Sequence, residues 1–183
     1  PLPGPVMKVL NFAINILRSV PFLILMIMVL PLSELLVGTT IGTVASIPPL
    51  IIASASFVAR LVETSLREVD KGVIEAAQSM GCSPFQIIWK VILPESLPSL
   101  VASFTTAFIT ILGYGAMAGA IGGGGLGKIA INYGYYKYNY AVMLIAVVFI
   151  VVLVQIFQSL GTSLATRTDH RITNRAGRRK HRR

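Results

Sequence analysis

One short run of glycines has the spacing of a phosphate-binding loop. Gly122, Gly127 and Lys128 follow the pattern G-x-x-x-x-G-K, in which backbone amides surround phosphates and the lysine neutralises their charge. The pattern fails at the next position, because Ile129 stands where a serine or threonine hydroxyl must coordinate magnesium. The run also follows a long apolar stretch instead of the strand that precedes such a loop. We therefore expect a turn here and no nucleotide site.

Residues for other kinds of catalysis are scarce. His170 and His181 lie in a basic tail, Cys82 is the only cysteine, and six of the seven acidic residues lie outside the long apolar stretches. This set offers no nucleophile with its base and no group of metal ligands. We predict no catalytic residue, no metal site and no cofactor bound by the chain itself. Glu34 borders two apolar stretches, so it either has a function in the membrane or marks the outer interface.

The composition indicates a membrane protein. Of the 183 residues, 54% are hydrophobic and 13% are charged, whereas about a quarter are charged in soluble proteins. The uncharged stretches cover residues 19–33, 35–59, 96–127 and 138–166. The last three exceed the roughly 20 residues that a helix needs to cross a bilayer. The first is shorter but intensely apolar, and we expect either a fourth span or a re-entrant or interfacial segment.

The net charge of +9 is concentrated at the end of the chain. Eight basic residues lie between 167 and 183, directly after the last apolar stretch. A basic cluster in this place is expected on the cytoplasmic side, where it contacts anionic lipid. We prefer this interpretation to binding of nucleic acid. Lys8 and Arg18 would lie on the same side, and the tyrosines between 133 and 140 would form an aromatic belt at the outer interface.

Small residues are concentrated before and within the predicted outer turn. Gly115 and Gly119 form a small-xxx-small pair, which permits helices to approach closely. Their contact lies either within the bundle of this chain or between two subunits. The glycines from 122 to 125 also permit unusual backbone geometry.

The stretch between 60 and 95 differs from the rest, because it is charged and contains turn residues. Charged side chains at 60, 63 and 67 recur at helical spacing, so the preceding span is predicted to continue beyond the membrane. Two short helices are predicted after Asp70. The first has an apolar edge and ends at Gly81, while a Ser83–Gln86 capping box begins the second, which Pro94 ends. The apolar edge needs a partner, either the chain's own bundle or another subunit.

Residues 75–98, EAAQSMGCSPFQIIWKVILPESLP, resemble the cytoplasmic EAA loop of type I ABC importer permeases. That pattern has Glu-Ala-Ala, a glycine after three further residues, and an apolar-Leu-Pro ending. The positions that match it are Glu75, Ala76, Ala77, Gly81, Ile92, Leu93 and Pro94. The resemblance implies that these residues couple the permease to a separate ATPase subunit, in which two coupling helices occupy a groove.

The resemblance extends from about Arg18 to the end of the last span, and in particular to the methionine importer permeases. The stretches that carry it include LRSVPFLILM, VGTTIG and GYGAMAGAIGGGGLGKIAINYGYYKYN. It implies an all-α polytopic transmembrane helix bundle, with about four spans in this chain and the family's first span missing. Two permease copies would form a homodimer with two ATPase subunits, which bind the ATP. An outer substrate-binding lipoprotein would deliver the amino acid.

We therefore predict a permease subunit of an ATP-driven importer in the bacterial inner membrane, and not an enzyme. Residues 1–166 form the transmembrane permease domain, with a cytoplasmic coupling loop at 67–95, and residues 167–183 form a basic cytoplasmic tail. The predicted substrate is D- or L-methionine, while another amino acid or a small organic anion is the alternative. A secondary transporter would need coupling charges within its spans, which this sequence almost lacks. A membrane anchor is a third class.

Overall fold

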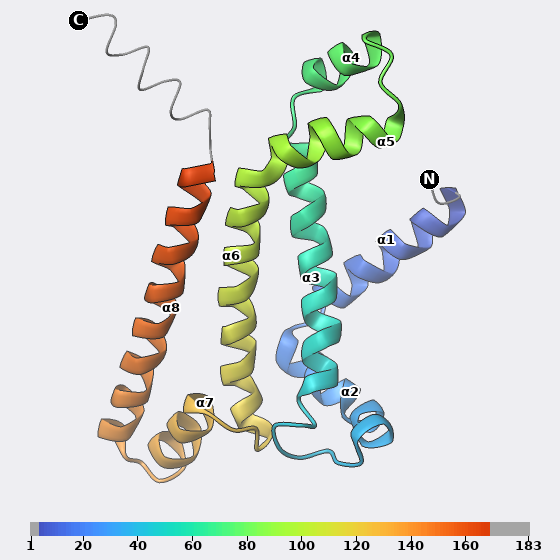
Figure 1. Cartoon of the computed structure of the whole chain (residues 1–183). Coiled ribbons are helices and arrows are strands. Elements are labelled where there is room, and N and C mark those ends of the chain that lie inside the picture. The colour runs from blue at the N-terminus through green and yellow to red at the C-terminus, as the bar shows by residue number, and fades with distance from the viewer. Residues whose placement is uncertain (1–3, 169–183) are drawn as a thin grey trace, which may run out of the picture. The chain divides into compact units, whose positions relative to one another are not determined.

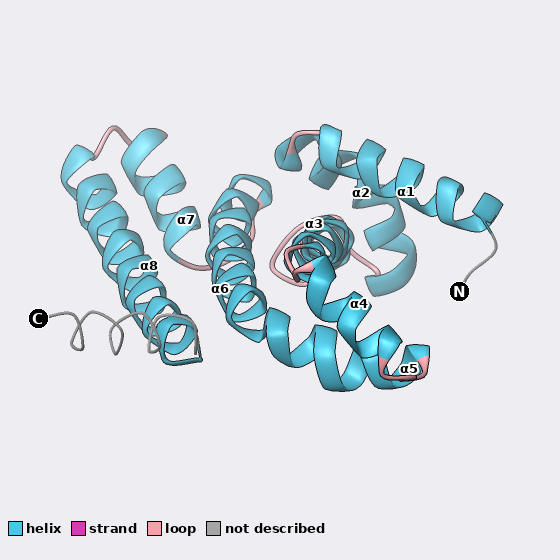
Figure 2. Ribbon diagram, turned by 90° about the horizontal axis from the view of Figure 1, so that it is seen from above, coloured by secondary structure: helices cyan, strands magenta, loops and turns pink. Residues whose placement is uncertain are grey.

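The computed structural model describes residues 4–168, and every regular element in that range is helical (Figures 1 and 2). Three helical segments in it are long and apolar enough to cross a membrane: Ile47–Arg67, Pro84–Ile121 and Tyr140–Thr168. A fourth span results if α1 (Gly4–Ser19) and α2 (Phe22–Val37), which meet at a bend of 112°, form one segment. The chain is therefore polytopic, as its composition predicts. Most of the predicted basic tail lies outside the described residues.

The helices belong to two compact units, and each unit combines segments that are distant in the sequence. Among the described residues, the first unit comprises 4–59 and 107–156, and the second comprises 60–106 and 157–168. Three long helices contribute residues to both units. They are α3 (Ile47–Arg67), α6 (Leu93–Met117) and α8 (Tyr140–Thr168).

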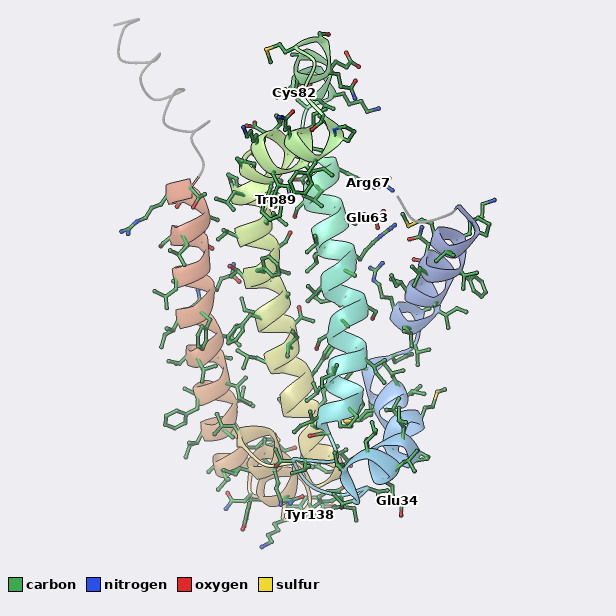
Figure 3. All side chains as sticks on the ribbon, turned by 45° about the vertical axis from the view of Figure 1, so that its right-hand side comes forward. Glu34, Glu63, Arg67, Cys82, Trp89 and Tyr138 are labelled. Carbon is green, nitrogen blue, oxygen red and sulfur yellow. The ribbon has the colours of Figure 1, made fainter. Side chains whose placement is uncertain are left out.

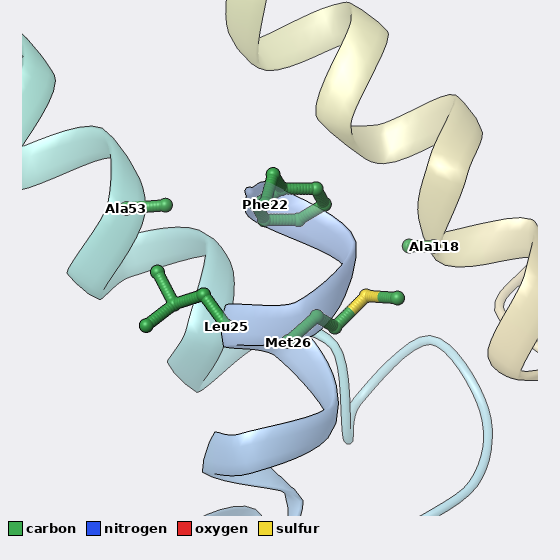
Figure 4. Close-up of a cluster of buried hydrophobic side chains, with 5 residues drawn as sticks. All are labelled: Phe22, Leu25, Met26, Ala53 and Ala118. Carbon is green, nitrogen blue, oxygen red and sulfur yellow. The ribbon is translucent and has the colours of Figure 1, made fainter. Parts of the chain in front are cut away.

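The core of the first unit forms around the beginning of α2. Five buried side chains make up this cluster: Phe22, Leu25, Met26, Ala53 and Ala118 (Figure 4). The ring of Phe22 also stacks on that of Tyr114, with 4.2 Å between the ring centroids. Large side chains on α2 thus face alanines on the neighbouring elements, and small residues of this kind let helices approach closely.

The predicted second span, residues 35–59, was too long at its beginning. The chain turns between α2 and α3, with Gly38 at φ +73° and Gly42 at φ +101°. These backbone conformations are open to glycine and strained for most other residues. The N–H of Gly38 donates to the carbonyl of Glu34, which caps α2, and the Glu34 side chain is exposed (Figure 3). Because the turn carries no charge, the spacing of charges could not reveal it.

The glycine run after α6 folds back against the turn between α2 and α3. It connects η2 (Ala118–Ile121) to α7 (Leu126–Ile129) and η3 (Ala130–Tyr135), which leads to α8 (Figure 2). The amides of Gly122 and Gly123 donate to carbonyls of η2 at 3.3 and 3.0 Å. The amide of Gly124 donates to the hydroxyl of Thr43 at 3.0 Å. These amides donate to groups of the same chain, as in the turn that the sequence predicts.

Close backbone contacts explain two glycines of this region. A Cβ atom on Gly119 would lie 2.5 Å from the backbone nitrogen of Lys128. A Cβ atom on Gly127 would overlap the backbone of Ala116. Gly115, by contrast, has no such neighbour within 4 Å. Of the predicted small-residue pair, Gly119 therefore packs closely within the chain, whereas Gly115 makes no such close contact.

The second unit holds the end of α3, which continues to Arg67 as predicted. It is followed by α4 (Lys71–Ser79) and α5 (Pro84–Ile87) (Figure 1). Hydroxyl groups and a glycine join its longer helices. The Oγ atoms of Ser65 and Ser103 lie 2.8 Å apart, and Gly161 of α8 packs so closely on the side chain of Thr105 that a Cβ atom has no room.

Much of the apolar surface of the long helices faces outward. The most apolar window of α8 has a mean hydropathy of 2.9, and 6% of that window is buried within the chain. A surface of this kind is stable only against lipid or against another subunit. The membrane class predicted from the composition therefore agrees with the way the helices pack.

Candidate functional site: the α4–α5 projection

The segment between residues 68 and 92, here called the α4–α5 projection, contains two short helices with well-defined ends (Figure 1). Asp70 caps α4, because its carboxylate accepts the N–H of Gly72 at 2.7 Å. A side-chain oxygen at this position satisfies one of the amides that a helix leaves unpaired. The helix predicted after Asp70 is therefore confirmed.

Gly81 ends α4 in the left-handed conformation that the sequence predicts, at φ +78°. Its N–H donates to the carbonyl of Gln78 at 2.9 Å, and the N–H of Cys82 donates to that of Ala77 at 3.1 Å. This pair of bonds is the Schellman motif, which satisfies the last carbonyls of a helix. Cys82 lies in the turn that follows (Figure 3). The direction of the chain after α4 is thus fixed by hydrogen bonds.

A capping box begins α5, as predicted. The N–H of Ser83 donates to Oε1 of Gln86 at 2.8 Å, and the N–H of Gln86 donates to Oγ of Ser83 at 3.4 Å. Pro84 occupies the first turn, where a missing N–H costs nothing. The two short helices therefore meet in a compact connection with bonded ends.

The prediction that Pro94 ends the second helix is wrong. A π-helical segment, η1 (Ile88–Ile92), follows α5 and leads directly into α6. The N–H of Leu93 donates to the carbonyl of Ile88, five residues earlier. This wide π-helical turn accommodates Pro94, the second residue of α6, without a break in the helical path. The axis changes direction at η1, but the chain does not leave the helix (Figure 1).

The projection buries few apolar side chains and exposes several large ones. Ala77 and Ile87 are buried, where α4 packs against α5 and η1. In contrast, Met80 is 76% exposed, Phe85 69% and Trp89 57%. The rings of Phe85 and Trp89 lie 6.0 Å apart, one helical turn from each other. An apolar patch of this size on a short capped unit is typical of a surface that docks into a partner.

The seven residues of the predicted EAA pattern are divided among three environments. Glu75, Ala76 and Gly81 are exposed on α4 and its turn. Ala77 is 2% exposed, so its small side chain serves packing within the chain. The last three are part of the junction with α6, where two are half-buried and the third is exposed: Ile92, Leu93 and Pro94.

Sequence reasoning missed Phe85 and Trp89. The resemblance directed attention to the pattern positions, and these aromatic residues lie between them. Their signal was nevertheless present, because two aromatic residues four positions apart lie on the same face of a helix. Trp89 is the only tryptophan of the chain, and it lies in η1 near the base of the projection (Figure 3).

Charged and polar groups lie where the projection joins α3 and α6. Glu63 bridges Arg60 at 2.6 Å and Arg67 at 2.7 Å on the surface of α3, as the spacing predicted. A cavity of about 320 Å³ lies nearby in the same unit, lined in part by Glu68 and Ser99. The hydroxyl of Ser99 donates to the carboxylate of Glu68 at 2.5 Å. No group of three or more potential metal ligands occurs among residues 4–168.

Residues 2–170 match the family described as the binding-protein-dependent transport system inner membrane component. The chain belongs to this family. It is 53% identical over 167 residues to a Vibrio cholerae protein named "Probable D-methionine transport system permease protein MetI", which covers 91% of this chain and 74% of the relative. It is 49% identical to the methionine import system permease protein MetP of Bacillus subtilis, covering 90% and 74% of the two chains.

A solved structure with a similar fold supports the fold described above. The structure described as inward-facing conformations of the MetNI methionine ABC transporter has a TM-score of 0.85 and 44% identity. The match covers 90% of this chain and 76% of that one. The predicted permease family and the all-α transmembrane fold are therefore confirmed. In the chain order, the α4–α5 projection lies between α3 and α6.

Proposed function

We propose that this chain is the membrane-spanning permease subunit of an ATP-driven ABC importer of methionine, either the D or the L form. The family membership makes it the membrane component of a transport system. The names of relatives that share about half of its residues support the substrate. Permeases for another amino acid or a small organic anion have the same type of loop, and transport of such a substrate is the alternative.

Coupling to ATP hydrolysis is proposed to occur through the loop at 67–95. The observation that carries this proposal is the exposed apolar surface of the α4–α5 projection, where Met80, Phe85 and Trp89 have little contact with their own chain. Because both short helices have hydrogen-bonded ends, the projection presents that surface in one conformation. A preformed surface loses little conformational entropy on docking, which favours tight binding.

Movement of a docked partner would reach the membrane through η1. The helical path continues from Pro84 to Ile121 without a loop, so a displacement of α5 must also move the beginning of α6. The Schellman motif at Gly81 keeps α4 in a fixed relation to this lever. Rigid elements of this kind transmit motion between sites, whereas a flexible loop would absorb it.

The remaining parts of the proposal concern partners and location. An ABC ATPase subunit would bind and hydrolyse ATP, a second copy of this chain would complete the pathway, and a substrate-binding lipoprotein would deliver the substrate. Residues 1–166 would form the permease domain in the bacterial plasma membrane, and 167–183 a basic cytoplasmic tail on anionic lipid. The similarity to a chain of the MetNI methionine ABC transporter supports an ATPase partner.

The test compares Phe85→Asp with the parent in a strain that lacks its own methionine importer and expresses the full-length permease, the ATPase and the binding protein. Phe85 is well exposed and lies in the first turn of α5. A carboxylate there is favourable for the helix, so the substitution leaves the projection folded. Loss of a central aromatic contact costs an interface about 2–4 kcal/mol, and we expect weak ATPase binding and little methionine uptake.

Lys71→Gln is the matched control, because it changes the net charge by the same amount in the first turn of α4, where the loss of a cation does not weaken the helix. It should leave uptake near the parent value. Equal uptake by the Phe85→Asp complex would refute the docking role of this surface. An assembled parent complex that hydrolyses ATP but takes up another amino acid would retain the importer and reject methionine. A parent chain that binds no ATPase would refute the importer itself.

A further inference from the structure

Helix α1 has an unusually clean division between polar and apolar residues. Lys8, Asn11, Asn15 and Arg18 follow one another at intervals of three, four and three residues. At about 100° per residue, these four side chains occupy one narrow arc of the helix. Apolar residues cover most of the remaining surface, and α1 contains no acidic residue. Such a pattern, with basic residues on the polar face, is typical of a helix that lies at a membrane surface.

Part of the apolar face of α1 packs on the first unit, and the rest is unoccupied. Leu17 lies against the core cluster around Phe22. Farther along the face, Val9 and Phe12 are each 67% exposed, and Ile16 is also exposed. The exposed apolar residues therefore lie beside an arc of positive charge. A partner that covers this side of α1 must contact apolar side chains and positive charges at the same time.

The direction of α1 and its polar side chains argue against a crossing of the bilayer. The helix ends at Ser19, and the chain bends by 112° into α2, which starts after Pro21. A continuous span would also place Asn11, Asn15 and Lys8 among acyl chains, where unpaired polar groups are costly.

We infer that α1 lies in the plane of the membrane interface and binds anionic phospholipid, while α2 enters the bilayer. The polar arc faces the headgroups, with Lys8 and Arg18 near the phosphates, and the exposed apolar residues reach the upper acyl chains. The α1 helix of a second copy is a poorer occupant, because it could cover the apolar residues but contains no acidic residue to pair with Lys8 and Arg18. The bend between α1 and α2 is then the point where the chain turns from the surface into the membrane.

Cysteine labelling of the assembled transporter in vesicles tests the orientation. Single cysteines replace Asn11, Asn15, Ala13 or Ile16 in a Cys82→Ser chain, and a membrane-impermeant maleimide is applied to the face that carries the α4–α5 projection. We expect the two asparagine positions to react and the two apolar positions to remain protected. Protection of all four would mean that α1 crosses the bilayer, and reaction of all four would place it in water; either result overturns the proposal.

Fluorescence quenching tests the lipid. Tryptophan replaces Phe12 in a Trp89→Phe chain, and the transporter is reconstituted with brominated phosphatidylglycerol or brominated phosphatidylcholine. We expect stronger quenching by the anionic lipid, and a fall in this preference of about fivefold for each charge removed by Lys8→Gln and Arg18→Gln. Equal quenching by both lipids, no quenching by either, or a preference that survives both substitutions would overturn anionic lipid binding.

Discussion

The backbone of Gly81 provides the sharpest quantitative prediction. At φ +78°, with no neighbouring atom within 4 Å of a Cβ atom, the cost of Gly81→Ala is conformational and involves no clash. A left-handed residue other than glycine costs about 1–2 kcal/mol. The variant relieves this strain when the two hydrogen bonds of the Schellman motif, which end α4, open. Gly81→Asn should cost less, because asparagine tolerates this conformation better than alanine.

Hydrogen exchange of the purified chain in lipid nanodiscs measures this effect directly. The amide of Cys82, bonded to the carbonyl of Ala77, should exchange about 5 to 30 times faster in Gly81→Ala, and Gly81→Asn should lie between this variant and the parent. Ser79→Ala is the control, because Ser79 has helical backbone and its hydroxyl donates only to the carbonyl of Glu75. The reasoning is refuted if alanine and asparagine at 81 behave alike, or if Ser79→Ala has the larger effect.

Two further predictions concern contacts between helices. Gly161→Ala should lower the melting temperature of the detergent-solubilised chain by overpacking, at a cost of about 1–3 kcal/mol, and Thr105→Ala should partly relieve it in the double variant because the side chain at fault is removed. Additive losses would show that the two residues do not share this contact. Gly127→Ala should also be destabilising, because a Cβ atom there meets the backbone of Ala116, which cannot move aside. Gly115→Ala should be near neutral, because nothing lies within 4 Å of its Cβ position. In the same thermal assay, Gly127→Ala should therefore lower the melting temperature more than Gly115→Ala.

The outcome at Pro94 shows how a local rule can fail. A proline in the interior of a helix usually kinks or ends that helix, because it lacks an N–H and its ring clashes with the preceding turn. Here the π-helical turn of η1 bonds Leu93 to Ile88, which widens the helix ahead of the proline. Whether a chain uses such a turn depends on the packing around it, and the spacing of residues before Pro94 does not signal it. The result matters for function, because a stop at Pro94 would have separated α5 from the span that it is proposed to move.

Local signals were reliable where a few neighbouring residues determine the geometry. The cap at Asp70, the left-handed Gly81 and the capping box at Ser83 depend on contacts within six residues, and each is present. The turn at Gly38 and Gly42 was missed, because charge marked the ends of the spans and the turn has none. The tight packing of Gly119 against Lys128 could be stated only as one of two alternatives, since the partner lies in a different element.

By itself, the sequence determined the membrane class, the permease family, both ends of α4 and the beginning of α5. These follow from composition and from interactions between close neighbours, which the chain order already contains. Only the tertiary structure decided which apolar residues lack a partner. Ala77 and Met80 are both apolar residues of one predicted edge, yet the first is buried and the second is 76% exposed. The difference arises because burial depends on how α4 packs against α5 and η1, and hydrophobicity alone contains no information about that packing.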